Sequence, residues 1–511
     1  MRAGKAVVIG AGVGGLVAAL ELAGRGLEVT VLERAGAPGG KMREVMAGGA
    51  AVDAGPTVFT MRWVFEEIFA EAGASLAEHL TLLPVEVLAR HAWSGGQRLD
   101  LFADRERSAG AIGAFAGRAE AEGYRAFCAR AGRIYATLEQ PFIRAARPGS
   151  PLSLVRAAGF AEMRGISPFS TLWRALGEHF RDPRLRQLFG RYATYCGSSP
   201  FLAPATLMLV AHVEQDGVWL VAGGMHRIAV ALAGLAAAKG AVFRYGAEVR
   251  EVLTEGGRAS GVVLASGERI AADAVVVNAD VAAVAAGMLG AGVAKATPRI
   301  APAQRSLSAV TWAMRVSASG FPLVRHNVFF SGDYEAEFRD IFRRGALPGE
   351  PTVYVCAQDR DDAGGGAPDG PERLLCLVNA PASGDSRPFP ASEIAQCEER
   401  MIRLLAHCGL TLERAAERTA ITTPEGFDRL FPATGGALYG QATHGAMASF
   451  RRPGARTTVP GLYLAGGSTH PGPGVPMAAL SGRLAAASVM ADRTSSAPSG
   501  RRAMRGGMSM R

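Results

Sequence analysis

The first 33 residues carry the pattern that most constrains the fold of this 511-residue chain. An apolar run at 5–9 leads into Gly10, Gly12, Gly14 and Gly15, small and apolar residues follow, and a second apolar run ends with Glu33. A strand, glycine turn, helix and strand in about 30 residues form a βαβ unit, whose glycines allow a pyrophosphate to approach the backbone. A carboxylate at the end of the second strand suits ribose hydroxyls. The pattern predicts a dinucleotide-binding α/β domain, and a glycine loop without a ligand is the simpler alternative.

The far end of the chain carries a matching element. Residues 461–482 are typical of a short strand, a glycine-rich turn and a helix that begins near Met477. Free backbone N–H groups at that helix start would suit the flavin edge that gains negative charge on reduction. Two such elements at remote ends of one chain indicate one large nucleotide cofactor, and we expect FAD.

Proteins that bind FAD and proteins that bind NAD share this glycine spacing, so the residues after the βαβ unit must distinguish the two cofactors. Gly39, Gly40 and Lys41 follow Glu33 closely, and the stretch 53–57 comes next. Both resemble elements of flavoproteins with two dinucleotide-binding domains, in which a second glycine pair and a basic residue lie against the flavin. A simple NAD dehydrogenase needs neither element, although the glycine pair alone is also compatible with a plain turn.

Three longer motifs resemble the bacterial carotenoid (phytoene-type) desaturases, and the resemblance covers nearly the whole chain. They are VWLVAGGM at 218–225, FPATGGALYG at 431–440 and the closing stretch GLYLAGG…GPGVPM at 461–477. The second motif is most similar to the 1-hydroxycarotenoid 3,4-desaturases of phototrophic bacteria. Lys41 stands where arginine is common, and Pro473 and Met477 stand where a small residue is frequent, which bears on the pocket beside the flavin.

The resemblance implies FAD-dependent desaturation of an acyclic carotenoid in carotenoid biosynthesis, with flavin N5 as the hydride acceptor. We expect 3,4-desaturation of a 1-hydroxy or 1-methoxy carotenoid, with a quinone or oxygen as the electron acceptor. A phytoene desaturase is the first alternative, and a non-catalytic lipid-binding protein on the same fold is the second. The resemblance and the glycine pattern together predict a set of residues that contact FAD. These residues are Gly10, Gly12, Gly14, Gly15, Glu33, Gly39, Gly40, Lys41, Gly55, Pro56, Thr57, Val249, Gly466, Gly467, Gly474, Val475 and Met477.

No residue is assigned as the proton acceptor, because a cation beside a long polyene is already delocalised. His470 lies in the closing turn, where a structural role is favoured over one facing the flavin. His212, Glu214 and Asp216 precede the motif at 218–225. A solvated turn is the favoured interpretation of these three residues, and proton transfer or binding of a substrate hydroxyl is the alternative. The resemblance implies that the backbone of Val249 contacts adenine, and an ordinary buried strand valine is an equally good interpretation.

The segments predict one α/β FAD-binding domain of Rossmann-like type, interrupted by a mixed α+β substrate domain. The cofactor domain would comprise 1–60, 216–290 and 456–492. A mainly helical insertion that faces the substrate and the membrane would occupy 61–215, and a segment of strands and helices would occupy 291–455. The basic stretch 493–511, rich in Gly, Ser and Arg, is predicted to be disordered.

Charge, cysteine spacing and apolar run length indicate which kinds of partner the chain can bind. The formal charge is +9, but no zinc finger, RNA-binding sheet signature or clustered Lys/Arg helix is present, so we expect a membrane surface and no nucleic acid. The six cysteines form no C-x-x-C pair, so no metal is expected. No apolar run reaches the roughly 20 residues that span a bilayer. These features predict a cytoplasmic protein bound peripherally to the inner or intracytoplasmic membrane.

Two segments are candidates for the membrane-facing surface. Residues 141–181 mix six arginines with large apolar residues, and residues 60–72 have an amphipathic pattern. Helices packed on their own domain are an equally good interpretation of either segment.

Overall fold

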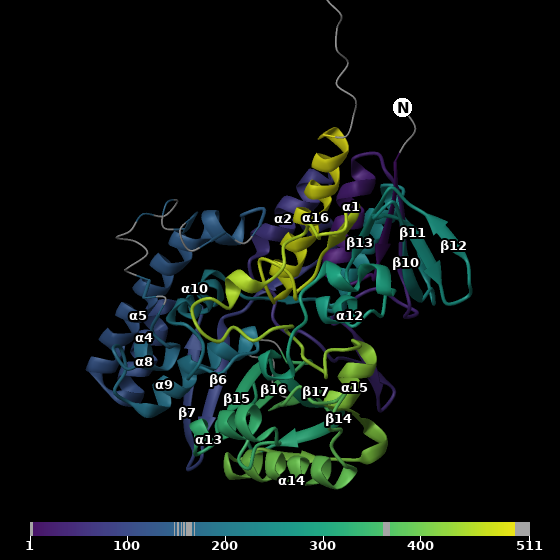
Figure 1. Cartoon of the computed structure of the whole chain (residues 1–511). Helices are drawn as coiled ribbons and strands as arrows, with labels where there is room; N and C mark the ends of the chain where they lie inside the picture. The colour runs from purple at the N-terminus through teal and green to yellow at the C-terminus, as the bar shows by residue number, and fades with distance from the viewer. Residues whose placement is uncertain are drawn as a thin grey trace, which may run out of the picture.

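The computed structural model describes residues 4–147, 149–150, 153–154, 156, 159, 166–167, 169–360 and 368–495. A parallel sheet with its helices forms the upper part of the molecule in Figure 1, a mixed sheet forms the lower part, and a group of helices lies to one side. This arrangement confirms the predicted α/β domain joined to a mixed substrate domain.

The upper sheet has five parallel strands in the order β20-β13-β1-β2-β9. Nearly all of β1, β13 and β20 is buried, as expected for a parallel sheet covered on both faces. The strands come from three separated stretches of chain that fall within the three predicted cofactor segments. Their bounds are β1 (Lys5–Ile9), β2 (Glu28–Glu33), β9 (Val242–Tyr245), β13 (Ala274–Val277) and β20 (Leu462–Leu464).

Helices α1 (Val13–Gly24), α11 (His226–Ala238) and α16 (Val475–Ser495) pack on this sheet, and α1 contacts both of the others. Backbones of α1 and α16 approach closely, because a Cβ on Gly482 would lie 2.2 Å from the carbonyl oxygen of Gly14. Helix α2 (Arg62–Glu71) packs beside α16. The apolar face of α2 is buried in the same core, so the candidate membrane surface at 60–72 is instead a packed helix.

A small antiparallel sheet extends the cofactor domain, and two further pairs of strands lie elsewhere in the chain. The sheet contains β10 (Val249–Glu255), β11 (Arg258–Leu264) and β12 (Arg269–Ala271), and α12 (Val281–Ala285) follows β13. One two-stranded pair is β3 (Glu44–Ala47) with β4 (Ala50–Asp53), and the other is β5 (Leu82–Pro84) with β8 (Trp219–Val221).

The lower sheet runs in the order β18-β14-β17-β16-β15-β6-β7, with β19 also paired to β14. Helix α14 (Ala391–His407) lies below it in Figure 1. The insertion 61–215 is mainly helical but also supplies β6 and β7, two strands that the sequence analysis missed; β6 pairs in parallel with β15 of the second insertion. The bounds are β6 (Val87–Trp93), β7 (Gln97–Phe102), β14 (Ser308–Ser319), β15 (His326–Phe329), β16 (Val353–Ala357), β17 (Glu372–Ala380), β18 (Thr411–Glu413) and β19 (Thr419–Thr422).

The helical region packs around stacked aromatic rings, for example Phe180 on Phe189 with ring centroids 4.7 Å apart. Its elements include α4 (Arg105–Ala116), α5 (Arg118–Leu138), the π-helix η1 (Glu139–Ile143), α8 (Leu172–Leu176), α9 (Pro183–Gly190), the 3₁₀ helices η2 (Arg191–Cys196) and η3 (Ala205–Met208), and α10 (Leu209–Asp216). Helices α13 (Tyr334–Arg339) and α15 (Pro424–Leu430) belong to the second insertion.

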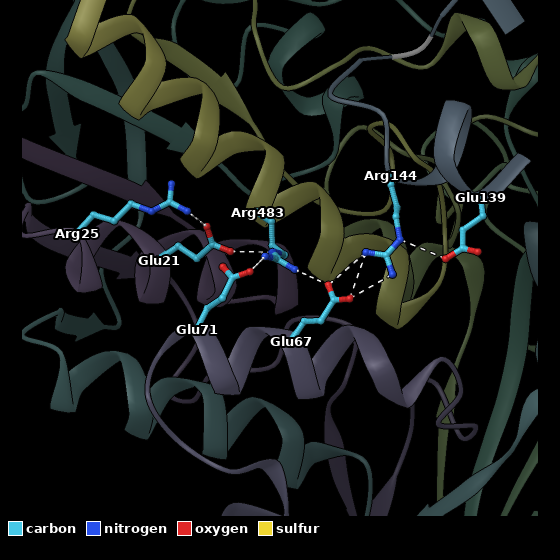
Figure 2. A network of polar contacts seen from close by, with 7 residues as sticks. All are labelled: Glu21, Arg25, Glu67, Glu71, Glu139, Arg144 and Arg483. Carbon is cyan, nitrogen blue, oxygen red and sulfur yellow. Dashed lines mark hydrogen bonds and ion pairs between the residues drawn. The ribbon is translucent and has the colours of Figure 1, made fainter. Parts of the chain in front are cut away.

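A network of ion pairs, which we call the outer arginine network, joins helices α1, α2 and α16 (Figure 2). Arg483 of α16 donates to Glu21 of α1 at 3.0 Å and to Glu67 of α2 at 2.9 Å, and also pairs with Glu71 of α2. Arg144, just after η1, binds Glu67 as well. The network thereby connects the two ends of the chain with the helical insertion.

The structure bears on two further predictions, the disordered tail at 493–511 and the membrane-facing segment at 141–181. Residues 493–495 continue α16 rather than starting a disordered tail, and 496–511 lie outside the described residues. Part of 141–181 also lies outside them; within the rest, Leu172 and Phe180 are buried and Phe169 is 89% exposed. None of the helices in the described ranges is long and apolar enough to cross a bilayer.

Candidate functional site

One cavity of about 1110 Å³ runs from the parallel sheet into the helical region and the lower sheet. All the predicted cofactor contacts except Gly15 line this cavity. Segments from the beginning, middle and end of the chain therefore meet at one site. Gly15 instead allows α1 and β1 to pack closely. A Cβ on Gly15 would lie 2.2 Å from the carbonyl oxygen of Gly10 and would push the helix away from the strand.

The opening turn leaves backbone donors free at the start of α1. Gly12 is the N-cap of α1 and supplies no side-chain hydrogen bond. Gly10 adopts φ +96°, a conformation that side chains other than glycine rarely tolerate. A Cβ on Gly14 would lie 2.8 Å from the backbone nitrogen of Gly466, so the opening and closing turns touch. An uncapped helix start at a glycine turn is a good site for a phosphate group.

Glu33 is held at the end of β2 with its carboxylate toward the cavity. One carboxylate oxygen accepts a hydrogen bond from Ala11 N at 2.7 Å, and the other accepts one from Ala35 N at 2.8 Å. Each oxygen keeps a lone pair, so the carboxylate can still accept hydrogen bonds from two sugar hydroxyls. Gly39 lies beside it, because its backbone nitrogen donates to Ala11 O at 2.9 Å.

Asn278 is a site residue that the sequence analysis missed. It follows β13 and lines the cavity, and its amide nitrogen donates to Ala465 O at 3.1 Å. The amide oxygen is buried and has no hydrogen-bond partner among the described residues. A Cβ on Gly12 would lie 2.7 Å from that oxygen, and one on Gly466 would lie 2.7 Å from the amide nitrogen. Its position at the carboxyl end of a parallel strand was the available signal.

Two cations lie beside the closing turn. Lys41 Nζ donates to Leu438 O at 2.6 Å, and Arg452, also missed from the sequence, donates to Tyr439 O at 3.1 Å and Gly467 O at 3.3 Å. Burial lowers the pKa of both side chains, and nearby Asp280 opposes this shift. Positive charge at this turn, together with the start of α16 after Gly474, suits a group that becomes negative on reduction.

His470 has a structural position. It is buried outside the cavity lining, and its Nε2 lies 3.0 Å from Ala145 O. Burial lowers its pKa to about 4, so the ring is neutral at pH 7. This placement agrees with the favoured structural role.

The segment with His212, Glu214 and Asp216 is the end of α10, so the favoured interpretation as a solvated turn is wrong for Glu214. Asp216 is exposed, and the ring of His212 packs 4.7 Å from Tyr135. Glu214 is buried and lines the cavity. The three side chains therefore do not form one cluster.

Glu214 instead belongs to a buried group that we call the inner arginine cluster: Arg191, Tyr192, Tyr195 and Glu214. Arg191 Nη2 lies 3.4 Å from Glu214 Oε1, and the Tyr195 hydroxyl donates to the same oxygen at 3.3 Å. Arg191 also donates to the Tyr195 hydroxyl, and the Tyr192 hydroxyl donates to Glu214 Oε2. Arg191, Tyr195 and Glu214 line the cavity. The sequence signal was the pair Arg191 and Tyr195, one helical turn apart, which the analysis did not single out.

Most of the cavity beyond the cofactor contacts is apolar. A second polar contact, between Thr57 Oγ1 and the Tyr354 hydroxyl at 2.7 Å, joins the predicted flavin region to β16 of the lower sheet. The apolar lining includes Leu138, Phe142, Ile143, Leu207, Val210, Val213, Leu375 and Leu377. Such walls suit a long hydrocarbon chain.

Comparison with known families decides the class of the protein. Residues 13–490 match the family described as flavin containing amine oxidoreductase. The chain belongs to this family. Its similarity to a solved member of the fold is structural: an oxidoreductase from Methanosarcina mazei superposes with a TM-score of 0.59 at 18% identity, over 95% of this chain and 100% of that one.

Several relatives of the chain are carotenoid desaturases by name. It is 59% identical to the hydroxyneurosporene desaturase of Rubrivivax gelatinosus, over 100% of this chain and 98% of that protein. It is 49% identical to the protein of that name from Cereibacter sphaeroides, over 96% and 98%. A 1-hydroxycarotenoid 3,4-desaturase from a Flavobacterium species is 29% identical over 94% and 98%.

The protein is therefore an FAD-dependent oxidoreductase, as predicted, which sets aside the non-catalytic lipid binder. The cavity fits such a cofactor on its own features. The start of α1 is uncapped, Glu33 keeps free lone pairs, and the amide oxygen of Asn278 is buried without a partner. A nucleotide cofactor would supply a partner for each of them.

Proposed function

We propose that this protein introduces the 3,4 double bond into an acyclic 1-hydroxy or 1-methoxy carotenoid. The observation that carries the proposal is one cavity with a nucleotide-type site at one end and apolar walls at the other, in a chain 59% identical to a hydroxyneurosporene desaturase. The cavity exceeds the roughly 300–1,000 Å³ of a usual small-molecule pocket, which leaves room for a cofactor and a chain-like substrate.

The residues of the cofactor end have distinct roles in this proposal. The start of α1 would hold the pyrophosphate, Glu33 would accept hydrogen bonds from the ribose, and Lys41, Arg452 and the start of α16 would surround the flavin. When bound, FAD supplies the hydride acceptor for a reaction that removes one hydride and one proton from adjacent carbons. The apolar walls exclude water and align the polyene. No side chain is assigned as the proton acceptor.

We also propose that the substrate enters from the surface of the inner or intracytoplasmic membrane. Ile166 and Phe169 line the cavity, and Phe169 is at the same time largely exposed. An exposed aromatic side chain at a cavity wall suits contact with lipid, from which a water-insoluble carotenoid must be taken. The arginines of 141–181 would add attraction to anionic lipids.

Turnover in liposomes tests the proposal. The FAD-loaded protein is incubated with vesicles that contain 1-hydroxyneurosporene or, separately, phytoene, and products are followed by absorption and HPLC. We expect a red shift by one conjugated bond with the hydroxylated substrate. Conversion of phytoene alone would instead favour the phytoene desaturase. Repeating the assay without oxygen and with an added quinone identifies the electron acceptor, and sedimentation of the same vesicles measures membrane binding.

A further inference from the structure

The inner arginine cluster has no structural explanation in terms of stability alone. The side chains of Arg191 and Glu214 are each 6% exposed, so both charges have lost their hydration. A buried ion pair contributes little net stability compared with apolar residues of similar volume, because desolvation offsets the attraction. This one also lies in the wall of the mainly apolar part of the cavity. Its position points to a polar group on the ligand.

The hydrogen bonds of the cluster define which polar group it can bind. The Tyr195 hydroxyl donates its single proton to Glu214 and accepts one hydrogen bond from Arg191. A phenol oxygen has two lone pairs, so one remains. Tyr195 is only partly buried although its neighbours Arg191 and Tyr192 are buried, and it lines the cavity. The cluster therefore offers the cavity a hydrogen-bond acceptor, whose complement is a ligand donor.

The element that carries Tyr195 also reaches the cofactor end of the cavity. Cys196, the last residue of η2, lines the cavity next to Tyr195. Gly197 then packs against Tyr439, since a Cβ on Gly197 would lie 2.5 Å from the Tyr439 ring. The carbonyl of Tyr439 is held by Arg452, which also holds the closing turn at Gly467. The segment that carries Tyr195 is therefore connected to the closing turn, beside which the flavin is expected.

We propose that Tyr195, oriented by Arg191 and Glu214, binds the terminal hydroxyl of the carotenoid by accepting its hydrogen bond. This inference rests on the proposed function and adds the residue that selects the substrate. In a 1-hydroxy carotenoid the hydroxyl is only two carbons from the bond that is oxidised, so one hydrogen bond fixes the register of the whole chain. A methoxy oxygen has no proton to donate, and an unsubstituted end offers no polar group. The subsite therefore favours the hydroxylated end.

The test compares Tyr195→Phe with Tyr124→Phe in the FAD-loaded protein. Tyr124 is a matched control, because it is buried outside the cavity lining and its hydroxyl accepts a hydrogen bond from Gln215 at 3.1 Å. Two quantities are measured with 1-hydroxyneurosporene and 1-methoxyneurosporene: kcat/KM for each substrate, and binding from the change in polyene absorption. FAD content and Tm of each variant report on folding.

For the unaltered protein we expect a higher kcat/KM and tighter binding with the hydroxylated substrate. Tyr195→Phe should lower kcat/KM for that substrate about tenfold and reduce the preference over the methoxylated one, whereas Tyr124→Phe should keep the preference. A Tyr195→Phe variant that loads FAD and keeps the full preference in binding and turnover would overturn the subsite. Failure of the unaltered protein to convert either substrate would count against the proposed function instead.

Discussion

The two arginine-centred groups of this protein have similar chemistry in different surroundings. Arg483 in the outer arginine network contacts three carboxylates, and its side chain is 20% exposed (Figure 2). Arg191 in the inner arginine cluster contacts one carboxylate and one tyrosine hydroxyl, and it is nearly inaccessible to water. The outer network joins three helices, whereas the inner cluster forms part of the cavity wall.

The difference shows how burial changes the role of an ion pair. The outer pairs with Glu67 and Glu71 are screened by water, so each stabilises the fold only slightly, by about 0–1 kcal/mol, whereas Glu21 is buried. Their main role is to connect α1, α2 and α16 at the place where the two ends of the chain meet. The inner pair gains more attraction but loses hydration, so it adds little net stability and confers specificity instead. Removing single partners from each group should separate these roles.

The largest effect is expected for Glu214→Ala. This change leaves Arg191 buried without a counter-ion and should lower the free energy of unfolding by about 3–5 kcal/mol. Denaturant unfolding of the FAD-free and FAD-loaded protein measures it. The double variant Arg191→Met/Glu214→Leu serves as the control, because it removes both charges and should recover most of the stability without recovering substrate selectivity. Equal stability of Glu214→Ala and the unaltered protein would contradict the burial argument.

An intermediate, pH-dependent effect is expected for Arg483→Met. Burial raises the pKa of Glu21 above its usual 4.5, while Arg483 and Arg25 oppose the shift. Loss of Arg483 raises that folded-state pKa further above the unfolded value, so the native state binds the extra proton. The cost, about 1–3 kcal/mol at pH 7 for a poorly compensated buried charge, should therefore shrink as the pH falls toward 4.5.

Thermal unfolding of Arg483→Met from pH 7 to pH 5 measures this dependence. Arg25→Met is the matched control, since Arg25 is more exposed and is paired with Glu21 alone in the network of Figure 2. Its effect should be smaller at every pH. A loss of stability in Arg483→Met that is the same at pH 5 and pH 7 would show that Glu21 is not the group responsible.

The cofactor end could be predicted from the sequence because its constraints are local. A positive φ at Gly10 and the close approach of Gly15 to Gly10 demand glycine at fixed spacing, and that spacing is visible in the chain. Glu33 and the closing turn could be predicted in the same way, from their spacing in the sequence. FAD and the α/β fold are confirmed, whereas the individual FAD contacts stay predictions that the cavity lining supports.

The substrate end was less predictable because its contacts are long-range. Strands β6 and β7 form a local hairpin around Gly95 and Gly96, a turn signal that the sequence analysis did not use, whereas the pairing of β6 with β15 of the other insertion is long-range. Glu214 was assigned to a solvated turn because its partners Arg191 and Tyr195 lie on a different element. Asn278 belongs to no glycine motif, and its only signal in the sequence was its place at the carboxyl end of a parallel strand, although it lies against both glycine turns. Tertiary packing, rather than spacing, brings these residues together.

The smallest effect is expected for Glu71→Gln at the rim of the outer network. The Glu71 side chain is 50% exposed, and Arg483 keeps Glu21 and Glu67 as partners after the change. The loss should be at most about 0.5 kcal/mol at low ionic strength, and it should disappear in about 1 M salt because the Debye length then falls to roughly 3 Å. Denaturant unfolding at both salt concentrations measures it. A loss as large as that of Arg483→Met, or one that persists in high salt, would mean that the outer network is as desolvated as the inner cluster.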